Sequence, residues 1–162
     1  MTRILDEMDR MLHSFRLTGP VKDGPDWKVY SDDGCGHAFE YPASATLRKV
    51  AEYSNASFNS PRIACEQAFS YNGQTYRVAV KVNLKDVDAL NMWLTSSGYP
   101  DLTHVRLIAQ GDRFTQYSDG TFTYIFTAGN VFIFTVTDER NQLTSTDGDR
   151  IFTHLLGSFT AH

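Results

Sequence analysis

The stretch ACEQAFSYNGQTYRVAVKVNL, residues 64–84, carries the strongest structural signal in the chain. At its centre, Asn72-Gly73 tolerates the two positive φ values of a type I′ turn, which predicts a β-hairpin. In the second arm large apolar residues alternate with smaller or polar ones: Tyr76, Val78, Val80, Val82 and Leu84 against Arg77, Ala79, Lys81 and Asn83. This alternation predicts a strand with one buried face and one wetter face.

Short strand signals continue on both sides of this hairpin. Upstream they are WKVYS (27–31), HAFEYP (37–42) after the turn DDGCG, and an edge strand within ATLRKVAEYS (45–54). Downstream they are HVRLIAQ (104–110), RFTQYS (113–118), TFTYIFT (121–127) and NVFIFTVT (130–137). The last is apolar on both faces from Val131 to Phe134, which predicts a central strand covered on both sides. Helices must supply part of that cover.

Two helices are predicted for the covering role. DVDALNMWLTSSG (86–98) has Asp86 as N-cap and Gly98 as its end, with Leu90, Trp93 and Leu94 facing inward. A last helix is predicted to begin near Ser145 to Asp147, with its apolar stripe at Phe152, Leu155, Leu156 and Phe159. In this region Asp147-Gly148-Asp149 resembles part of a calcium loop, but the later ligands of such a loop are missing. We therefore interpret the segment as a helix N-cap.

The N-terminus repeats the spacing of that last stripe. Met8, Met11, Leu12 and Phe15 are also spaced i, i+3, i+4, i+7, and a Ser precedes the final Phe in both copies. Any amphipathic helix repeats in this way. The shared Ser-Phe also suggests that the N-terminal helix is the closing helix of an upstream copy of the domain, or a duplicate of the last helix of this chain. The stripe is predicted to be an interaction surface, packed on the chain's own sheet or on a second molecule. We therefore expect a helix in 1–18, a linker in 19–26 and one domain in 27–162.

Composition excludes several classes of protein. The 162 residues suit one domain, with 41% hydrophobic and 21% charged residues. A net charge of −4, with Lys and Arg scattered singly, argues against nucleic-acid binding. No apolar run reaches the roughly 20 residues that span a bilayer, so no membrane insertion is expected. Asp6, Glu7 and Asp9 interrupt the only N-terminal apolar pattern, so no signal peptide is expected in this chain. We expect a cytoplasmic protein, or a mature or trimmed piece of an exported protein.

The densest polar cluster is SDDGCGH, residues 31–37. Asp32, Asp33, Cys35 and His37 are weak candidates for metal ligands, because carboxylate, thiolate and imidazole suit zinc. A hairpin turn needs Asp and Gly for its geometry alone, and we favour that interpretation. We expect no metal and no cofactor. Cys35 and Cys65 match no metal spacing, and both a disulfide and two free thiols remain open.

No catalytic phrase occurs in the chain. HExxH, GxSxG, P-loop and GxGxxG patterns are all absent from the sequence. A spatial Cys–His pair, for instance Cys65 with His104, stays open as an alternative. We expect a protein that is not an enzyme.

Four phrases resemble the PsbP-like and Mog-like domain family. WKVYSDDGCGHAFEYPAS (27–44) looks like its opening strands, and IFTHLLGSFTAH (151–162) looks like its closing helix with the Leu-x-Ser/Thr-Phe ending. VDALNMWLTSSG and YIFTAGNVFIFTVT match its middle helix and last central hairpin. The resemblance covers about Asp26 to His162, and its motifs are structural rather than catalytic.

The resemblance implies an α+β fold: an α/β/α sandwich around a central, mainly antiparallel sheet. It also implies a non-catalytic binding or accessory domain of a bacterial envelope protein, with an extracytoplasmic location. The alternatives are a small Cys/His-dependent enzyme and a structural interaction module in a tandem array. Partners are expected to be proteins or a second copy, bound through the N-terminal helix.

Overall fold

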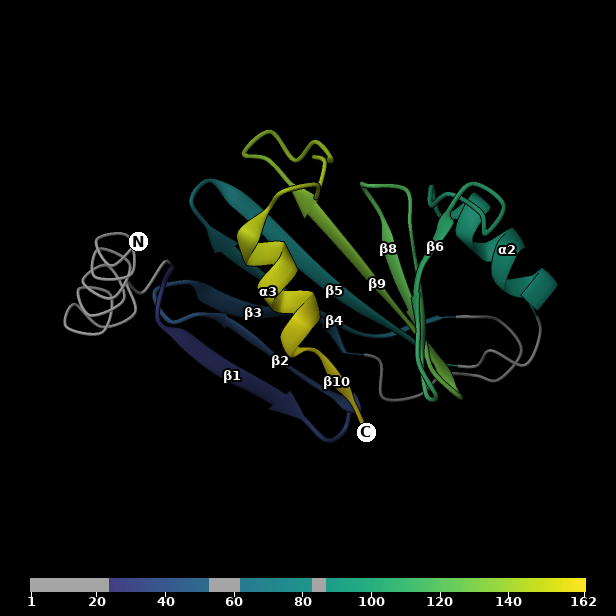
Figure 1. Cartoon of the computed structure of the whole chain (residues 1–162), viewed down its shortest axis with the longest axis horizontal. Coiled ribbons are helices and arrows are strands. Elements are labelled where there is room, and N and C mark those ends of the chain that lie inside the picture. The colour runs from purple at the N-terminus through teal and green to yellow at the C-terminus, as the bar shows by residue number, and fades with distance from the viewer. Residues whose placement is uncertain (1–23, 53–61, 83–86) are drawn as a thin grey trace, which may run out of the picture.

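The computed structural model describes residues 24–52, 62–82 and 87–162. Within them the strands are β1 (Trp27–Asp32), β2 (His37–Pro42), β3 (Thr46–Glu52), β4 (Arg62–Tyr71), β5 (Gln74–Val82), β6 (Arg106–Gln110), β7 (Thr115–Ser118), β8 (Thr123–Phe126), β9 (Asn130–Thr137) and β10 (Thr160–Ala161). The described helices are α2 (Val87–Ser96) and α3 (Arg150–Ser158). The described strands form a large sheet of order β3-β4-β5-β9-β8-β7-β6 and a small sheet of order β1-β2-β10. Neighbouring strands are antiparallel (Figure 1).

The predicted hairpins are confirmed. β4 and β5 pair directly on either side of Asn72 and Gly73, whose φ angles of 48° and 74° are those of a type I′ turn. β1 pairs with β2 around the DDGCG turn. β3 lies at one edge of the large sheet, as predicted.

β9 is the central strand that its apolar run predicts. It lies between β5 and β8, and every residue from Val131 to Thr137 is buried. Its side chains alternate between two cores. Phe132, Phe134 and Val136 pack with Phe152 and Leu155 of α3. Val131 and Ile133 pack on the other face with Leu90 and Leu94 of α2. The two helices therefore cover different faces of the large sheet.

Contacts with the small sheet hold α3 in place. Trp27 of β1 stacks on His154 with ring centroids 3.6 Å apart. Glu40 of β2 accepts a contact from His154 Nε2 at 2.5 Å, and its backbone N–H donates to Ser158 Oγ at 2.9 Å. In Figure 1, α3 lies in front of the large sheet beside β2. Ser158 of the repeated Ser-Phe phrase thus ties the helix end to the small sheet.

α3 begins later than predicted, at Arg150 instead of near Ser145 to Asp147. Gly148 has a φ of +72°, a left-handed conformation that a right-handed helix cannot include. Asp149 is the N-cap, and its Oδ1 accepts from the Phe152 backbone N–H at 3.0 Å. The predicted N-capping role of this segment is confirmed, although the predicted start is wrong.

α2 follows the sequence prediction at its described residues. Leu90 and Leu94 are buried, and Trp93 is partly buried. Gly98 ends the helix with a φ of +81°, and the Tyr99 N–H donates to the Leu94 carbonyl at 2.8 Å. The predicted N-cap, Asp86, lies outside the described residues. In the part of the chain that the structure describes, neither helix is long and apolar enough to cross a membrane.

The described residues form an α+β fold with a mainly antiparallel sheet and two short helices, in agreement with the predicted class. The predicted N-terminal helix, with its stripe of Met8, Met11, Leu12 and Phe15, lies outside the described residues. So does most of the predicted linker.

Candidate functional site

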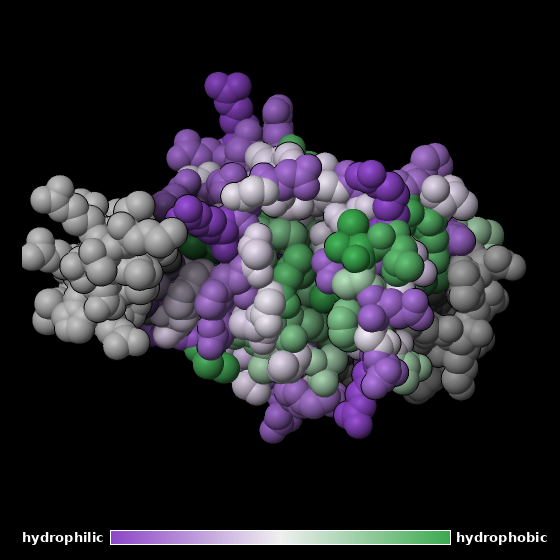
Figure 2. Space-filling view, in the orientation of Figure 1, coloured by the Kyte–Doolittle hydropathy of each residue, from purple (hydrophilic) through white to green (hydrophobic). Residues whose placement is uncertain are grey.

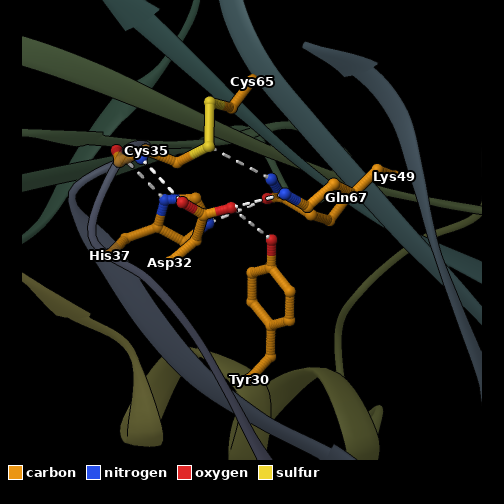
Figure 3. Close-up of a disulfide and its surroundings, with 7 residues drawn as sticks. All are labelled: Tyr30, Asp32, Cys35, His37, Lys49, Cys65 and Gln67. Carbon is orange, nitrogen blue, oxygen red and sulfur yellow. Dashed lines mark hydrogen bonds and ion pairs between the residues drawn. A yellow bond between two sulfur atoms is a disulfide. The ribbon is translucent and has the colours of Figure 1, made fainter.

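Three regions were candidates for a functional site. The first is the polar cluster of the β1–β2 turn (Figure 3). Cys35 forms a disulfide with Cys65 of β4, across a Cα–Cα separation of 5.9 Å. Both cysteines of the chain are used in this bond, which joins the small sheet to the large one. The sequence left the pairing open because the two residues are 30 positions apart.

Asp32 is held entirely by neighbouring protein groups. Lys49 Nζ lies 2.8 Å from its carboxylate, the Tyr30 hydroxyl donates to it at 2.9 Å, and the Cys35 N–H donates at 3.1 Å. The hydrogen bonds from Lys49 and then Tyr30 lower the pKa of Asp32 to about 2. Asp33, by contrast, has a nearly fully exposed side chain, 3.4 Å from His162 Nε2.

His37 is fully buried beside the disulfide. Its Nε2 lies 2.8 Å from Gln67 Oε1, and its Nδ1 lies 3.3 Å from the Cys35 carbonyl oxygen. A neutral imidazole donates one proton, so it satisfies one of these acceptors at a time. Burial lowers the pKa of His37 and favours the neutral ring.

The four weak metal candidates are therefore engaged with the protein itself. Among the described residues, no group of three or more His, Cys, Asp or Glu side chains is arranged to hold a metal ion. Asp32 and the Gly-containing turn instead stabilise the tight β1–β2 hairpin, in which the Asp32 carboxylate accepts from the Cys35 N–H.

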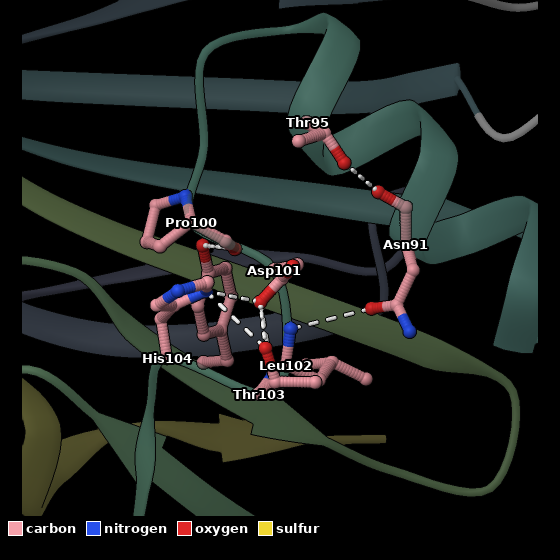
Figure 4. A network of polar contacts seen from close by, with 8 residues as sticks. Asn91, Thr95, Pro100, Asp101, Leu102, Thr103 and His104 are labelled. Atoms are coloured by element: carbon pink, nitrogen blue, oxygen red, sulfur yellow. Dashed lines mark hydrogen bonds and ion pairs between the residues drawn. The ribbon is translucent and has the colours of Figure 1, made fainter.

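The second region is the loop between α2 and β6, which contains His104 (Figure 4). His104 Nδ1 contacts Asp101 Oδ1, and the Thr103 hydroxyl donates to the same oxygen at 2.6 Å. These contacts lower the pKa of Asp101, and the hydrogen bond from Thr103 contributes most. The Leu102 N–H donates to Asn91 Oδ1 of α2 at 3.3 Å. The network fixes the loop.

The alternative Cys65–His104 pair finds no support in this geometry. Cys65 is bonded to Cys35, so it carries no thiol in this state. His104 is exposed and turned to Asp101. A nucleophilic thiolate needs a free sulfur beside a base.

The third region is an open groove of about 870 Å³, which we name the C-terminal groove. One wall is the last turn of α3 with the tail that follows it, residues 156–162. The other comprises the β6–β7 turn, β7, β8 and the β8–β9 turn. Its main lining side chains are Arg113, Phe114, Gln116, Ile125, Leu156 and Phe159. Figure 2 shows apolar surface between α3 and β6, on the face that carries this groove.

The α3 wall is firmly anchored. The Phe159 ring packs edge-on against Phe132 and Phe134, with centroids 4.8 Å and 5.1 Å away. Beyond it, β10 pairs with β2, and the His162 N–H donates to the Gly36 carbonyl at 2.9 Å. The wall is thus fixed by the core on one side and by the small sheet on the other.

The groove floor is apolar and its rim is polar. Ile125 is buried at the floor, whereas Phe114 is 41% exposed. Arg113 is exposed and makes no hydrogen bond or ion pair within the described residues. At Gly157 the wall carries no side chain, and an added Cβ would meet nothing within 4 Å. Apolar floors with few polar rim groups are typical of ligand-binding sites.

Sequence reasoning missed this site. The sequence pattern places Leu156 and Phe159 in a helix stripe. It places Arg113, Phe114 and Ile125 in strands and predicts no binding role for them. No local pattern marks these residues, because the groove exists only where α3 and the β6–β9 meander meet. The predicted interaction surface on the N-terminal helix lies outside the described residues.

Comparisons with known proteins add a structural likeness. No protein family of known sequence matches the chain, and no curated protein matches it. Among solved structures, the chain is similar to the solution structure of cyanobacterial PsbP (CyanoP) from Synechocystis sp. PCC 6803. The match has 14% identity and a TM-score of 0.48, and covers 89% of this chain and 96% of that chain. It names the family that the sequence resembles, and at this level it carries no inference about function.

Proposed function

We propose that the chain is a non-catalytic binding or accessory domain whose ligand occupies the C-terminal groove. The observation that supports this is the groove itself, which has the size of a small-molecule or peptide side-chain site at about 870 Å³. Its apolar lining favours an apolar portion of the ligand, because covering the exposed Phe114 ring removes apolar area from water. Arg113 at the rim favours an anionic group beside that portion.

The proposal includes an extracytoplasmic location in a bacterial envelope. The support is the buried Cys35–Cys65 disulfide, since structural disulfides persist in oxidising compartments. It also includes the finer description of the frame as an α/β/α sandwich of the PsbP-like and Mog-like kind. The placement of α2 and α3 on different faces of the large sheet supports that description.

A fluorescent amphipathic anion, anilinonaphthalene sulfonate, tests the groove directly. We expect saturable, one-to-one fluorescence enhancement with the native chain. Gly157→Leu should weaken this binding at least about tenfold, because the added side chain fills the groove from a position with open space. Arg150→Leu, on the same helix outside the groove, should leave it unchanged.

Near-ultraviolet circular dichroism verifies that each variant keeps its tertiary packing, because loosened proteins also bind this dye. Absence of binding by the native chain contradicts the proposal. Equal binding by the native chain and Gly157→Leu does so as well, because the dye then lies elsewhere.

A further inference from the structure

The two edges of the large sheet differ in chemistry. β3, at one edge, carries Arg48, Lys49 and Glu52 in seven residues, and Lys49 is paired with Asp32 of β1. Charges of this kind protect an edge strand from pairing with another chain. β6, at the other edge, has the sequence RLIAQ with a single charge. Among the described strands, none pairs with the outer side of β6.

Apolar side chains gather at the β6 edge of the large sheet. Leu107 and Ile108 are each 55% exposed, and Phe114 in the turn after β6 is 41% exposed. They are three of the seven large apolar side chains that are exposed in the described part of the chain. Ile108 lies at the irregularity where the register with β7 shifts between Leu107 and Ala109. An apolar edge strand with unpaired backbone groups is suited to main-chain pairing with a second strand.

We propose that β6 pairs with β6 of a second copy, antiparallel about a twofold axis at Ile108. In this register Arg106 lies opposite Gln110 of the other copy, and Leu107 lies opposite Ala109. The diagonal neighbour of Arg106 is Asp112 of the other copy, at a spacing that long side chains reach. Asp112 also lines the C-terminal groove, so the proposed contact lies next to that groove, but pairing through β6 does not require a ligand in it.

Charge complementarity selects this arrangement. Arg106 precedes the strand centre and Asp112 follows the strand, so an antiparallel pair brings opposite charges together twice. A parallel pair would instead place Arg106 beside Arg106 of the other copy, and two like charges at this distance are destabilising. Neither the Arg106 side chain nor the Asp112 side chain makes a hydrogen bond or ion pair within the described residues. A twofold pair of this kind is self-complementary and closes without forming fibres.

Analytical ultracentrifugation over a wide concentration range tests the proposal. We expect a reversible monomer–dimer equilibrium for the native chain. Ile108→Lys should abolish the dimer, because it places two ammonium groups at the axis. Arg106→Asp and Asp112→Arg should each weaken the dimer about tenfold, since each reversal turns two attractive contacts into like-charge contacts. The double variant restores both contacts, so its dimer should match that of the native chain.

Arg140→Asp, which changes an exposed arginine in the loop between β9 and α3, is the matched control and should leave the dimer intact. Gly157→Leu should also dimerise normally, which separates this proposal from the proposed groove. A native chain that stays monomeric at every concentration overturns the proposal. So does a dimer that survives Ile108→Lys, since another surface then forms it. Failure of the double variant to recover overturns the assigned register.

Discussion

Removing the disulfide between Cys35 and Cys65 should destabilise the chain more than any single surface change. The bond closes a loop across a sequence separation of 30 and joins the β1–β2 turn of the small sheet to β4 of the large sheet. A cross-link of this kind restricts the unfolded chain, and the restriction is lost when the bond is reduced. Both sulfurs are also buried, so two polar thiols would replace them in an apolar core.

The loop length sets the size of the effect. Chain-entropy reasoning gives about 3.5 kcal/mol of unfolding free energy for a closed loop of this length. For a chain of this size, each kcal/mol shifts the melting temperature by about 2–4 °C. We therefore expect the melting temperature to fall by about 10 °C when the bond is reduced.

Urea unfolding and thermal melting, each with and without a phosphine reductant, measure this loss. Cys35→Ala/Cys65→Ala provides the control, because a reductant should not change its stability. It should be about as unstable as the reduced native chain. If the reduced and oxidised native chains melt within a degree of each other, the disulfide carries no stability and the loop argument is wrong.

Replacing the N-cap of α3 should also lower the unfolding free energy. Lowering the pH should do so as well, through protonation of the buried His37. Asp149→Ala removes the acceptor of the Phe152 N–H and a charged acceptor 3.0 Å from the Tyr76 hydroxyl, so urea unfolding should show a loss of about 2 kcal/mol. Asp149→Asn keeps a capping oxygen and should lose less; equal losses contradict the capping role. Burial lowers the pKa of His37 below 6.5, so its stabilising contribution is complete above that pH and is lost as the pH falls toward the folded pKa. The unfolding free energy should therefore decrease as the pH falls below about 6.5, and an equally steep decrease in His37→Gln would contradict this origin.

The elements that sequence reasoning predicted correctly are those with local causes. Asn72-Gly73 determines a hairpin because few other residue pairs adopt two positive φ values. The apolar run from Val131 to Phe134 requires cover on both faces, and β9 does lie at the centre of the large sheet with helices on either side. In both cases the information lies within a few neighbouring residues.

Features that depend on distant contacts could not be predicted. Pairing of Cys35 with Cys65 requires the β1–β2 turn to lie over β4, and no pattern in the sequence predicts that arrangement. α3 begins only after the left-handed Gly148, and the Thr146 hydroxyl upstream of it donates to the Gly120 carbonyl, 26 residues away, a contact that no local pattern indicates. The same limit applies to the groove, whose walls come from separate parts of the chain.

The disulfide and the groove are connected through the small sheet. Cys35 lies next to Gly36, whose carbonyl accepts from the His162 N–H and so holds the tail that forms one groove wall. The same turn is attached to β4 by the disulfide, so the tail is fixed to the large sheet through both its own ring contacts at Phe159 and the cross-linked turn. An oxidising compartment would therefore keep the groove wall in position as well as stabilise the fold. A reducing one would leave that wall dependent on the β2–β10 pairing and Phe159 alone. The same covalent bond therefore supports both the proposed location and the proposed binding site.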